Sequence, residues 1–116
     1  MANMGLGTDF SARARLGPGG LTVWTDQDAE RCVFRLKGSL NAETVSLLNH
    51  HIDLLGRRSC EQVVVDLAGL EKLDTVGARL IVGLAHYVSG RGGTLSVQGT
   101  TPYMETLLAD ARLELG

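Results

Sequence analysis

The sequence predicts one α/β domain (α+β in some schemes), with a mixed four-stranded sheet and helices in the order ββαβαβα. Three observations lead to this class: two segments near the start that alternate apolar with polar residues, a central run of β-branched residues, and apolar residues at helical spacing after the later strands. The opening hairpin pairs antiparallel, whereas strands separated by helices pair in parallel, so the sheet is mixed. Residues 1–20 are rich in glycine and are expected to be a flexible lead-in to a domain over residues 21–116.

The first half of the domain is expected to form a hairpin and one helix. Residues 21–24 and 31–36 alternate apolar with polar side chains, as half-buried strands do. Asn41 is a good helix N-cap and Gly56 a good stop, so we expect a helix over about residues 42–55. The apolar face of this helix comprises Val45, Leu48, Ile52 and Leu55.

The second half alternates strands with helices. Residues 62–67 are nearly all apolar and β-branched, which is typical of a strand with a layer on each side. A tight loop over residues 68–73 is expected next, followed by a second helix that begins after Asp74 and ends at the glycine-rich turn 90–93. Residues 94–99 predict a fourth strand, and Thr101 with Pro102 predicts the start of a third helix. The expected buried faces of these helices are Leu80 or Ile81, Leu84 and Val88, and then Met104, Leu107, Leu108 and Ala111.

Composition excludes several classes of protein. The 116 residues carry a formal net charge of −2, without the clustered basic face that nucleic-acid binding requires. The longest strongly apolar run, residues 80–85, is far shorter than the ~20 residues that span a bilayer, so no membrane insertion is expected. Cys32 and Cys60 stand far apart and form no CxxC pair, which favours two reduced thiols in a cytoplasmic protein.

The sequence contains none of the common motifs for catalysis, phosphate loops or metal ligands, so we expect no catalytic residue, cofactor or metal. His50 and His51 are adjacent on the first expected helix and point ~100° apart, which favours a solvated His50 and a boundary His51 over a shared metal ion. A small enzyme that uses Asp66, Asp74 and His86 stays open, and a polar pocket joining the three would support it.

The main candidate functional residues lie at the start of the second helix. Asp74 can cap the free N–H groups of the first turn, and Thr75 occupies the first helical position with its hydroxyl at the surface. Gly77 removes a side chain from this turn, so that another backbone or a partner can approach closely. A phosphate on Thr75 would lie at the positive end of the helix dipole and add about −1.5 to −2 charges beside Asp74. The plainer interpretation is that these residues only cap a helix.

The chain resembles the STAS domain family over about residues 21–115. The resemblance rests on five short motifs in a fixed order. These are the turn at 38–41, the strand at 64–67, the helix start at 74–77, the turn into the fourth strand at 92–95 and the start of the third helix at 101–102. The family fold, a mixed sheet with helices largely on one side, agrees with the order of elements derived above.

The resemblance is to the anti-sigma factor antagonists of this family, which are protein-binding regulators of transcription and not enzymes. In these antagonists the residue after the motif aspartate accepts a phosphate from a partner anti-sigma factor, a serine/threonine kinase. The unmodified form binds the kinase, and phosphorylation breaks the complex. The resemblance implies that Thr75 is the phosphoacceptor. The implied partner-binding residues are Ser39, Asn41, Asp74, Thr75, Gly77 and Ala78.

The sequence also departs from the antagonist pattern. Threonine replaces the commoner serine, Asn41 replaces the usual aspartate, and Ala78 with Arg79 replaces Leu-Gly. A helix that starts Asp-Thr-x-Gly-Ala is similar to the STAS domains of bacterial phospholipid-transport ABC systems. The alternative function is therefore a cytoplasmic STAS subunit or segment that binds the permease and ATPase of such a system.

Overall fold

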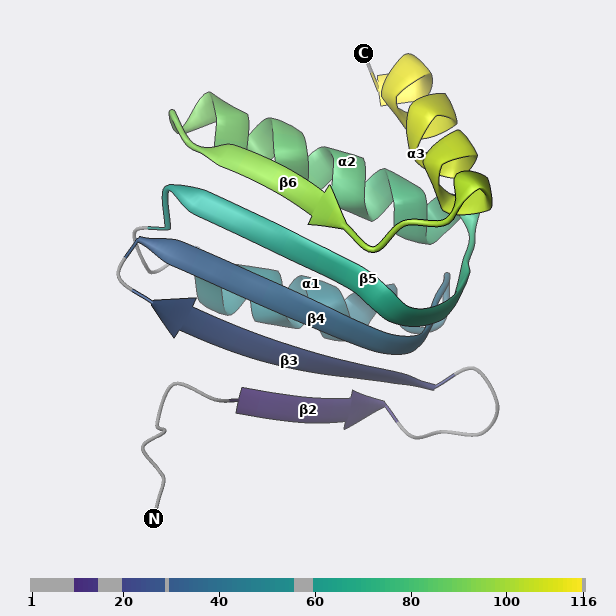
Figure 1. The fold of residues 1–116 in the computed structure, drawn as a ribbon, viewed down its shortest axis with the longest axis horizontal. Helices are drawn as coiled ribbons and strands as arrows, with labels where there is room; N and C mark the ends of the chain where they lie inside the picture. Colours follow the sequence, from purple (N-terminus) through teal and green to yellow (C-terminus); the bar gives the residue numbers. More distant parts are fainter. Residues whose placement is uncertain (1–9, 15–19, 29, 56–59, 116) are drawn as a thin grey trace.

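The computed structural model describes residues 10–14, 20–28, 30–55 and 60–115. In chain order the elements are β2 (Phe10–Ala14), β3 (Leu21–Asp28), β4 (Arg31–Leu40), α1 (Val45–Leu55), β5 (Gln62–Leu73), α2 (Thr75–Gly90), β6 (Thr94–Gln98) and α3 (Pro102–Leu115). The strands form one sheet in the order β2-β3-β4-β5-β6, antiparallel from β2 to β4 and parallel from β4 to β6 (Figure 1). The mixed sheet and the order ββαβαβα predicted from residue 21 onward are confirmed.

A fifth strand at the edge of the sheet was not predicted. β2 pairs with β3 from Phe10↔Thr25 to Ala14↔Leu21, within the range 1–20 that was expected to be a flexible lead-in. An edge strand is held by backbone hydrogen bonds to its neighbour, and a glycine-rich local composition gives no sign of that pairing. The ordered sheet therefore begins before residue 21.

The helices cover one face of the sheet. In Figure 1 both α1 and α2 lie behind the strands, and α3 packs against α2. The side chains of Phe34 and Val65 are paired across β4 and β5 and fully buried, whereas Arg35, the next residue of β4, is exposed on the opposite face. A layer on each side of residues 62–67 was expected, but no helix of the described part of the chain covers the second face. Val64, on that face, is nevertheless buried in the middle of the sheet.

β5 continues through residues 68–73, where a loop was expected. This segment stays paired with the end of β4, and two irregularities of register accommodate extra residues of β5. The loop prediction was wrong because charged residues and a glycine there are absorbed as bulges in the strand. The pairing ends at Leu40↔Leu73, so both strands finish side by side, directly before the turn to α1 and the start of α2.

The helices begin close to their predicted positions. α2 starts at Thr75 and α3 at Pro102, as predicted, whereas α1 starts at Val45 because residues 41–44 form a separate turn. The predicted stop at Gly56 lies outside the described residues. None of the described helices is long and apolar enough to cross a membrane. The predicted faces are largely confirmed by the buried residues Leu48, Ile81, Leu84, Val88, Met104, Leu108 and Ala111.

Cys32 and Cys60 form a disulfide, which contradicts the expectation of two reduced thiols. Cys32 lies in the core near the start of β4, and Cys60 lies just before β5. The parallel pairing of these strands brings the two Cα atoms to 5.9 Å, within the range that a disulfide requires. The two residues are separated by 28 positions, so only the strand pairing reveals that they meet.

Candidate functional site

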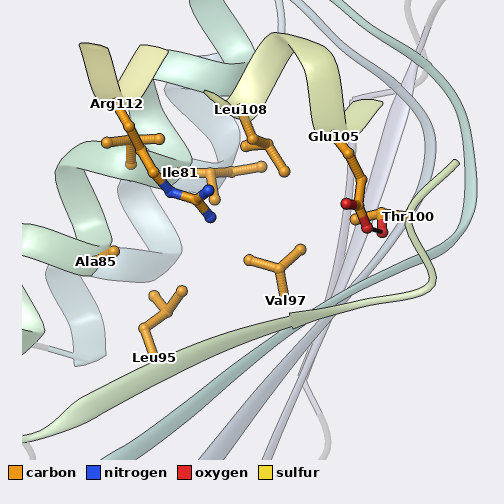
Figure 2. A pocket seen from close by; sticks show the side chains of 9 residues that line it. Ile81, Ala85, Leu95, Val97, Thr100, Glu105, Leu108 and Arg112 are labelled. Atoms are coloured by element: carbon orange, nitrogen blue, oxygen red, sulfur yellow. Dashed lines mark hydrogen bonds between the residues drawn. The ribbon is translucent and has the colours of Figure 1, made fainter. Parts of the chain in front are cut away.

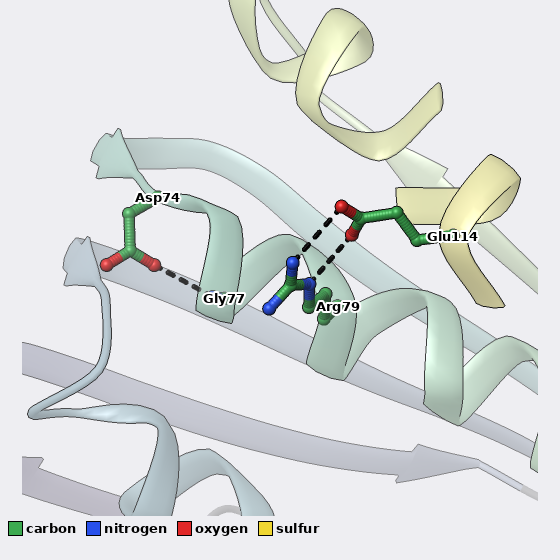
Figure 3. A network of polar contacts seen from close by, with 4 residues as sticks. All are labelled: Asp74, Gly77, Arg79 and Glu114. Carbon is green, nitrogen blue, oxygen red and sulfur yellow. Dashed lines mark hydrogen bonds and ion pairs between the residues drawn. The ribbon is translucent and has the colours of Figure 1, made fainter. Parts of the chain in front are cut away.

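The carboxylate of Asp74 joins the two turns that follow the ends of β4 and β5. Its Oδ1 accepts a hydrogen bond from the backbone N–H of Gly77 at 2.8 Å, as the N-cap of α2 (Figure 3). Its Oδ2 accepts a hydrogen bond from the backbone N–H of Ala42 at 3.2 Å. The backbone N–H of Asp74 also donates to the carbonyl of Leu40 at 3.2 Å. The start of α2 and the turn before α1 are therefore held together at one end of the sheet.

The turn before α1 is fixed by its own side chains. Asn41 Oδ1 accepts the backbone N–H groups of Glu43 at 2.9 Å and Thr44 at 3.1 Å. The hydroxyl of Thr44 donates to the carbonyl of Ser39 at 2.8 Å and accepts the N–H of Asn41 at 2.9 Å. Asn41 thus serves as the predicted cap, although it caps this turn and α1 begins after it. The half-buried Asn41 presents a neutral amide beside Asp74.

Gly77 lets α2 approach the end of β4 more closely than any other residue would allow. A Cβ built on Gly77 would lie 2.7 Å from the Leu40 carbonyl oxygen and 3.0 Å from a methyl carbon of Leu73. The close approach anticipated at Gly77 is therefore made by a backbone of the same chain. Ala78 and Ser39 are also buried, at 0% and 3% exposure.

Three of the six expected partner-binding residues are accessible to a partner. Thr75 is exposed at the first position of α2, Asp74 and Asn41 are half-buried beside it, and Val76 is 38% exposed. The other three expected residues, Ser39, Gly77 and Ala78, lie inside the structure and position the surface. We call Asn41, Ala42, Asp74, Thr75 and Val76 the α2-start surface.

An ion pair that no sequence pattern indicated lies next to this surface. The guanidinium of Arg79 donates from Nε to Glu114 Oε1 at 2.8 Å and from Nη2 to Oε2 at 3.1 Å (Figure 3). The hydrogen bonds to Glu114 raise the pKa of Arg79, and those from Arg79 lower the pKa of Glu114. The pair links α2 to the last turns of α3. Its partners are 35 positions apart, so only the helix packing brings them together.

The two adjacent histidines of α1 lie in different surroundings. His51 is buried, and its Nδ1 shares a hydrogen bond of 2.9 Å with the hydroxyl of Thr25 on β3. Burial, and to a smaller extent the nearby His50, lower the pKa of His51. His50 is exposed, as its helical position predicted. Among the residues that the structure describes, no group of three or more His, Cys, Asp or Glu side chains could hold a metal ion.

The three residues of the enzyme hypothesis are not brought together. Asp66 lies on the open face of β5 and accepts the backbone N–H of Ala68 at 2.9 Å. Asp74 follows the end of the same strand. The paired stretch of β4, from Arg35 to Leu40, is about 16 Å long at ~3.3 Å per residue, so the two carboxylates lie far apart. His86 is exposed on α2, about 18 Å along the helix axis from Asp74 at 1.5 Å per residue. The pocket that Asp66 lines on the open face of the sheet includes neither Asp74 nor His86.

A cavity and a groove among the helices are formed by described residues. A cavity of about 190 Å³ lies between α2, β6 and α3; Figure 2 shows the apolar side chains of Ile81, Val97 and Leu108 around it, with Arg112 reaching over it. None of the six expected site residues lines this cavity. A larger groove of about 560 Å³ lies between α1 and α2, and Arg79 is part of its wall. The groove is lined by Asn49, Ile52, Asp53, Arg79, Leu80, Gly83, Leu84 and Tyr87.

A family model described as "Mlab, STAS domain" matches residues 23–114. The chain belongs to the STAS domain family. An anti-sigma F factor antagonist from Paenibacillus polymyxa is 30% identical to this STAS domain over 77 residues, which cover 66% of each protein. The match thus spans slightly less than two thirds of that relative's length.

Solved structures support the same STAS fold. The anti-sigma factor antagonist SpoIIAA in its unphosphorylated form superimposes with a TM-score of 0.66 at 16% identity, over 78% of this chain and 81% of that one. A variant of RsbS from Moorella thermoacetica gives a TM-score of 0.65 at 15% identity, over 77% and 76%. The STAS domain of an antagonist from Rhodobacter sphaeroides gives 0.56 at 15% identity, over 68% and 86%. At these identities the likeness establishes the fold.

Proposed function

We propose that this STAS domain is an anti-sigma factor antagonist that binds an anti-sigma factor with serine/threonine kinase activity and is released when Thr75 is phosphorylated. The observation that carries the proposal is the exposed Thr75 on a surface that Asp74 fixes through Gly77 and Ala42. The curated relative, named as an anti-sigma F factor antagonist, supports it. The domain itself supplies a binding surface and an acceptor hydroxyl, and needs no cofactor or metal for either.

The proposed modification is an ordinary phosphoryl transfer from ATP. The Thr75 hydroxyl oxygen attacks the γ-phosphorus, an O–P bond forms, the bond to the β-phosphate bridging oxygen breaks and ADP leaves. The hydroxyl proton passes to a base of the kinase. Because ATP and such kinases are found in the cytoplasm, we propose that the domain acts there.

Phosphorylation would change the charge of the α2-start surface and leave the fold intact. The phosphate adds about −1.5 to −2 charges at the first turn of α2, where the helix dipole favours an anion. A partner that packs against the neutral hydroxyl and against Val76 would instead meet a strongly hydrated dianion beside Asp74. We expect the complex to dissociate because desolvating that charge costs more than the contact gains.

The test is phosphorylation in vitro by the kinases encoded near the gene. With ATP, the intact mass should rise by one phosphoryl group, and the modified protein should no longer bind the kinase. Thr75→Val keeps the shape and removes the hydroxyl, so it should bind without being modified, whereas Thr75→Ser should be modified. If no such kinase changes the mass, or if Thr75→Val is modified equally, the proposal fails.

A second candidate is the cytoplasmic STAS subunit or segment of a phospholipid-transport ABC system. It is favoured by the helix start from Asp74 to Ala78, which resembles that group more than the antagonists. Its partners would be a permease and an ATPase, bound at the same α2-start surface without a phosphate switch. Affinity capture from the native host distinguishes the two: recovery of a permease with its ATPase supports this candidate, and recovery of an anti-sigma kinase contradicts it.

A further inference from the structure

Arg79 stands one helical turn after Thr75 on the same exposed side of α2. The two residues are four positions apart, the spacing at which side chains on a helix surface meet, and both are exposed. Long side chains in a helix lean toward its N-terminus, which directs Arg79 toward the first turn. The guanidinium of Arg79 is therefore placed one helical turn from a group attached to the Thr75 oxygen.

Glu114 leaves one side of that guanidinium free. The carboxylate accepts from Nε and Nη2, which occupies one edge of the planar group. The remaining nitrogen, Nη1, donates to no side chain of the described residues. In Figure 3 this nitrogen points away from Glu114, to the side on which Asp74 and Gly77 lie. An arginine has five N–H donors, so it can hold a carboxylate on one edge and an anion on another.

We propose that Arg79 holds the phosphate of phosphorylated Thr75, with Glu114 as the positioning residue that fixes the guanidinium. The inference rests on the proposed function only in taking Thr75 as the modified residue. A phosphate oxygen accepts from Nη1 in a charge-assisted hydrogen bond, which is stronger than a neutral one. Asp74 repels the same phosphate, and Arg79 offsets that repulsion.

This contact gives Arg79 opposite roles in the two states of the protein. In the unmodified domain its positive charge lies at the edge of the α2-start surface and on the wall of the α1–α2 groove, where a partner can use it. In the modified domain the guanidinium binds the phosphate, so its positive charge is no longer available to the partner. Phosphorylation therefore both adds negative charge and withdraws a positive charge from the partner.

The second pKa of the phosphate measures the contact directly. The full chain is prepared with phosphothreonine encoded at position 75, and the ³¹P chemical shift is followed against pH. The dianion is stabilised by Arg79, so its pKa should be lower, by about half a pH unit, than in the double variant Arg79→Gln with Glu114→Gln. The double variant removes one positive and one negative charge, so the net charge is unchanged and Asp74 acts equally on both proteins.

The control is Arg91→Gln, at the other end of α2, where the guanidinium stacks on Tyr87. Its phosphate should titrate as in the unsubstituted chain. Because the side chains of Arg79 and Glu114 are each 49% exposed, the double variant should stay folded, which thermal denaturation checks. Equal pKa values in the unsubstituted chain and the double variant would overturn the proposal. The titration needs no kinase, so its result is independent of whether a kinase that modifies Thr75 is found.

Discussion

Asp74 Oδ2 lies 3.2 Å from the backbone nitrogen of Ala42 and accepts its hydrogen bond across two turns that are 32 positions apart in the chain. The same carboxylate caps α2 through Gly77. One side chain thus sets both the start of the helix and the distance between the two turns that make up the α2-start surface. Different substitutions of Asp74 are therefore expected to change the stability of the domain and the geometry of the α2-start surface to different extents.

Asp74→Ala should lower the free energy of unfolding by about 1 kcal/mol, because an N-cap is lost. Asp74→Asn keeps an oxygen for the Gly77 N–H but turns an NH₂ group toward Ala42, so most of the stability should remain while the link to Ala42 is lost. Urea denaturation measures the first effect, and hydrogen exchange of the Ala42 amide measures the second. Unchanged exchange at Ala42 in both variants would contradict the bridging role of Asp74.

Gly77→Ala should destabilise the domain by about 1–3 kcal/mol, because the new methyl group meets the Leu40 carbonyl oxygen at 2.7 Å. The matched control is Gly83→Ala in the same helix, where an added Cβ meets nothing within 4 Å. Removing a helical glycine there should stabilise by up to about 1 kcal/mol. Denaturant unfolding of the two variants should give shifts of opposite sign, and a shared sign would show that helix propensity outweighs the close approach.

His51 should make the domain less stable as the pH falls. Its pKa in the folded state is lowered by burial and by His50, so the unfolded chain binds a proton more readily than the folded one. The contribution of neutral His51 to stability is fully present above the pKa of about 6.5 that histidine has in the unfolded chain. It is lost as the pH falls from there through the lowered pKa of the folded state. Denaturation between pH 8 and 5 should show this loss, and His51→Gln should reduce it. A slope that is unchanged in His51→Gln would assign the loss to other groups.

Reduction of the Cys32–Cys60 disulfide should lower the free energy of unfolding. Closing a loop over a separation of 28 positions restricts the unfolded chain, an effect of roughly 3–4 kcal/mol in the chain-entropy estimate. Dithiothreitol should therefore shift the denaturation midpoint of the protein and leave Cys60→Ser unaffected. Alkylation at lysis measures whether the disulfide is present in the cell, and a closed disulfide there would argue against the proposed cytoplasmic location.

Local patterns were sufficient to predict most of the fold. The cap at Asp74, the helix start at Thr75 and the buried faces of α2 and α3 follow from side-chain type and spacing, and the structure has them where they were expected. The exposure of Thr75 follows from its position before the apolar stripe of α2. These features depend on residues within one or two turns of each other, which is the range that a sequence pattern covers.

The features that the sequence missed depend on distant residues. β2 is defined by its pairing with β3, the extension of β5 by its pairing with β4, and the disulfide by the meeting of two strands. The burial of Ser39 and Ala78 is likewise set by packing between turns that the sequence separates. For the same reason Arg79 was noticed only as a departure from a motif, although its partner Glu114 gives it a defined orientation.

The tight contact between Gly77 and the carbonyl of Leu40 has a consequence for signalling. At Gly77 the first turn of α2 already lies against the end of β4, so it cannot move closer to the sheet when a group is attached to its outer side. Phosphorylation of Thr75 would thus change the charge of the surface without changing its backbone. Any conformational change on binding or release would then occur in the partner protein.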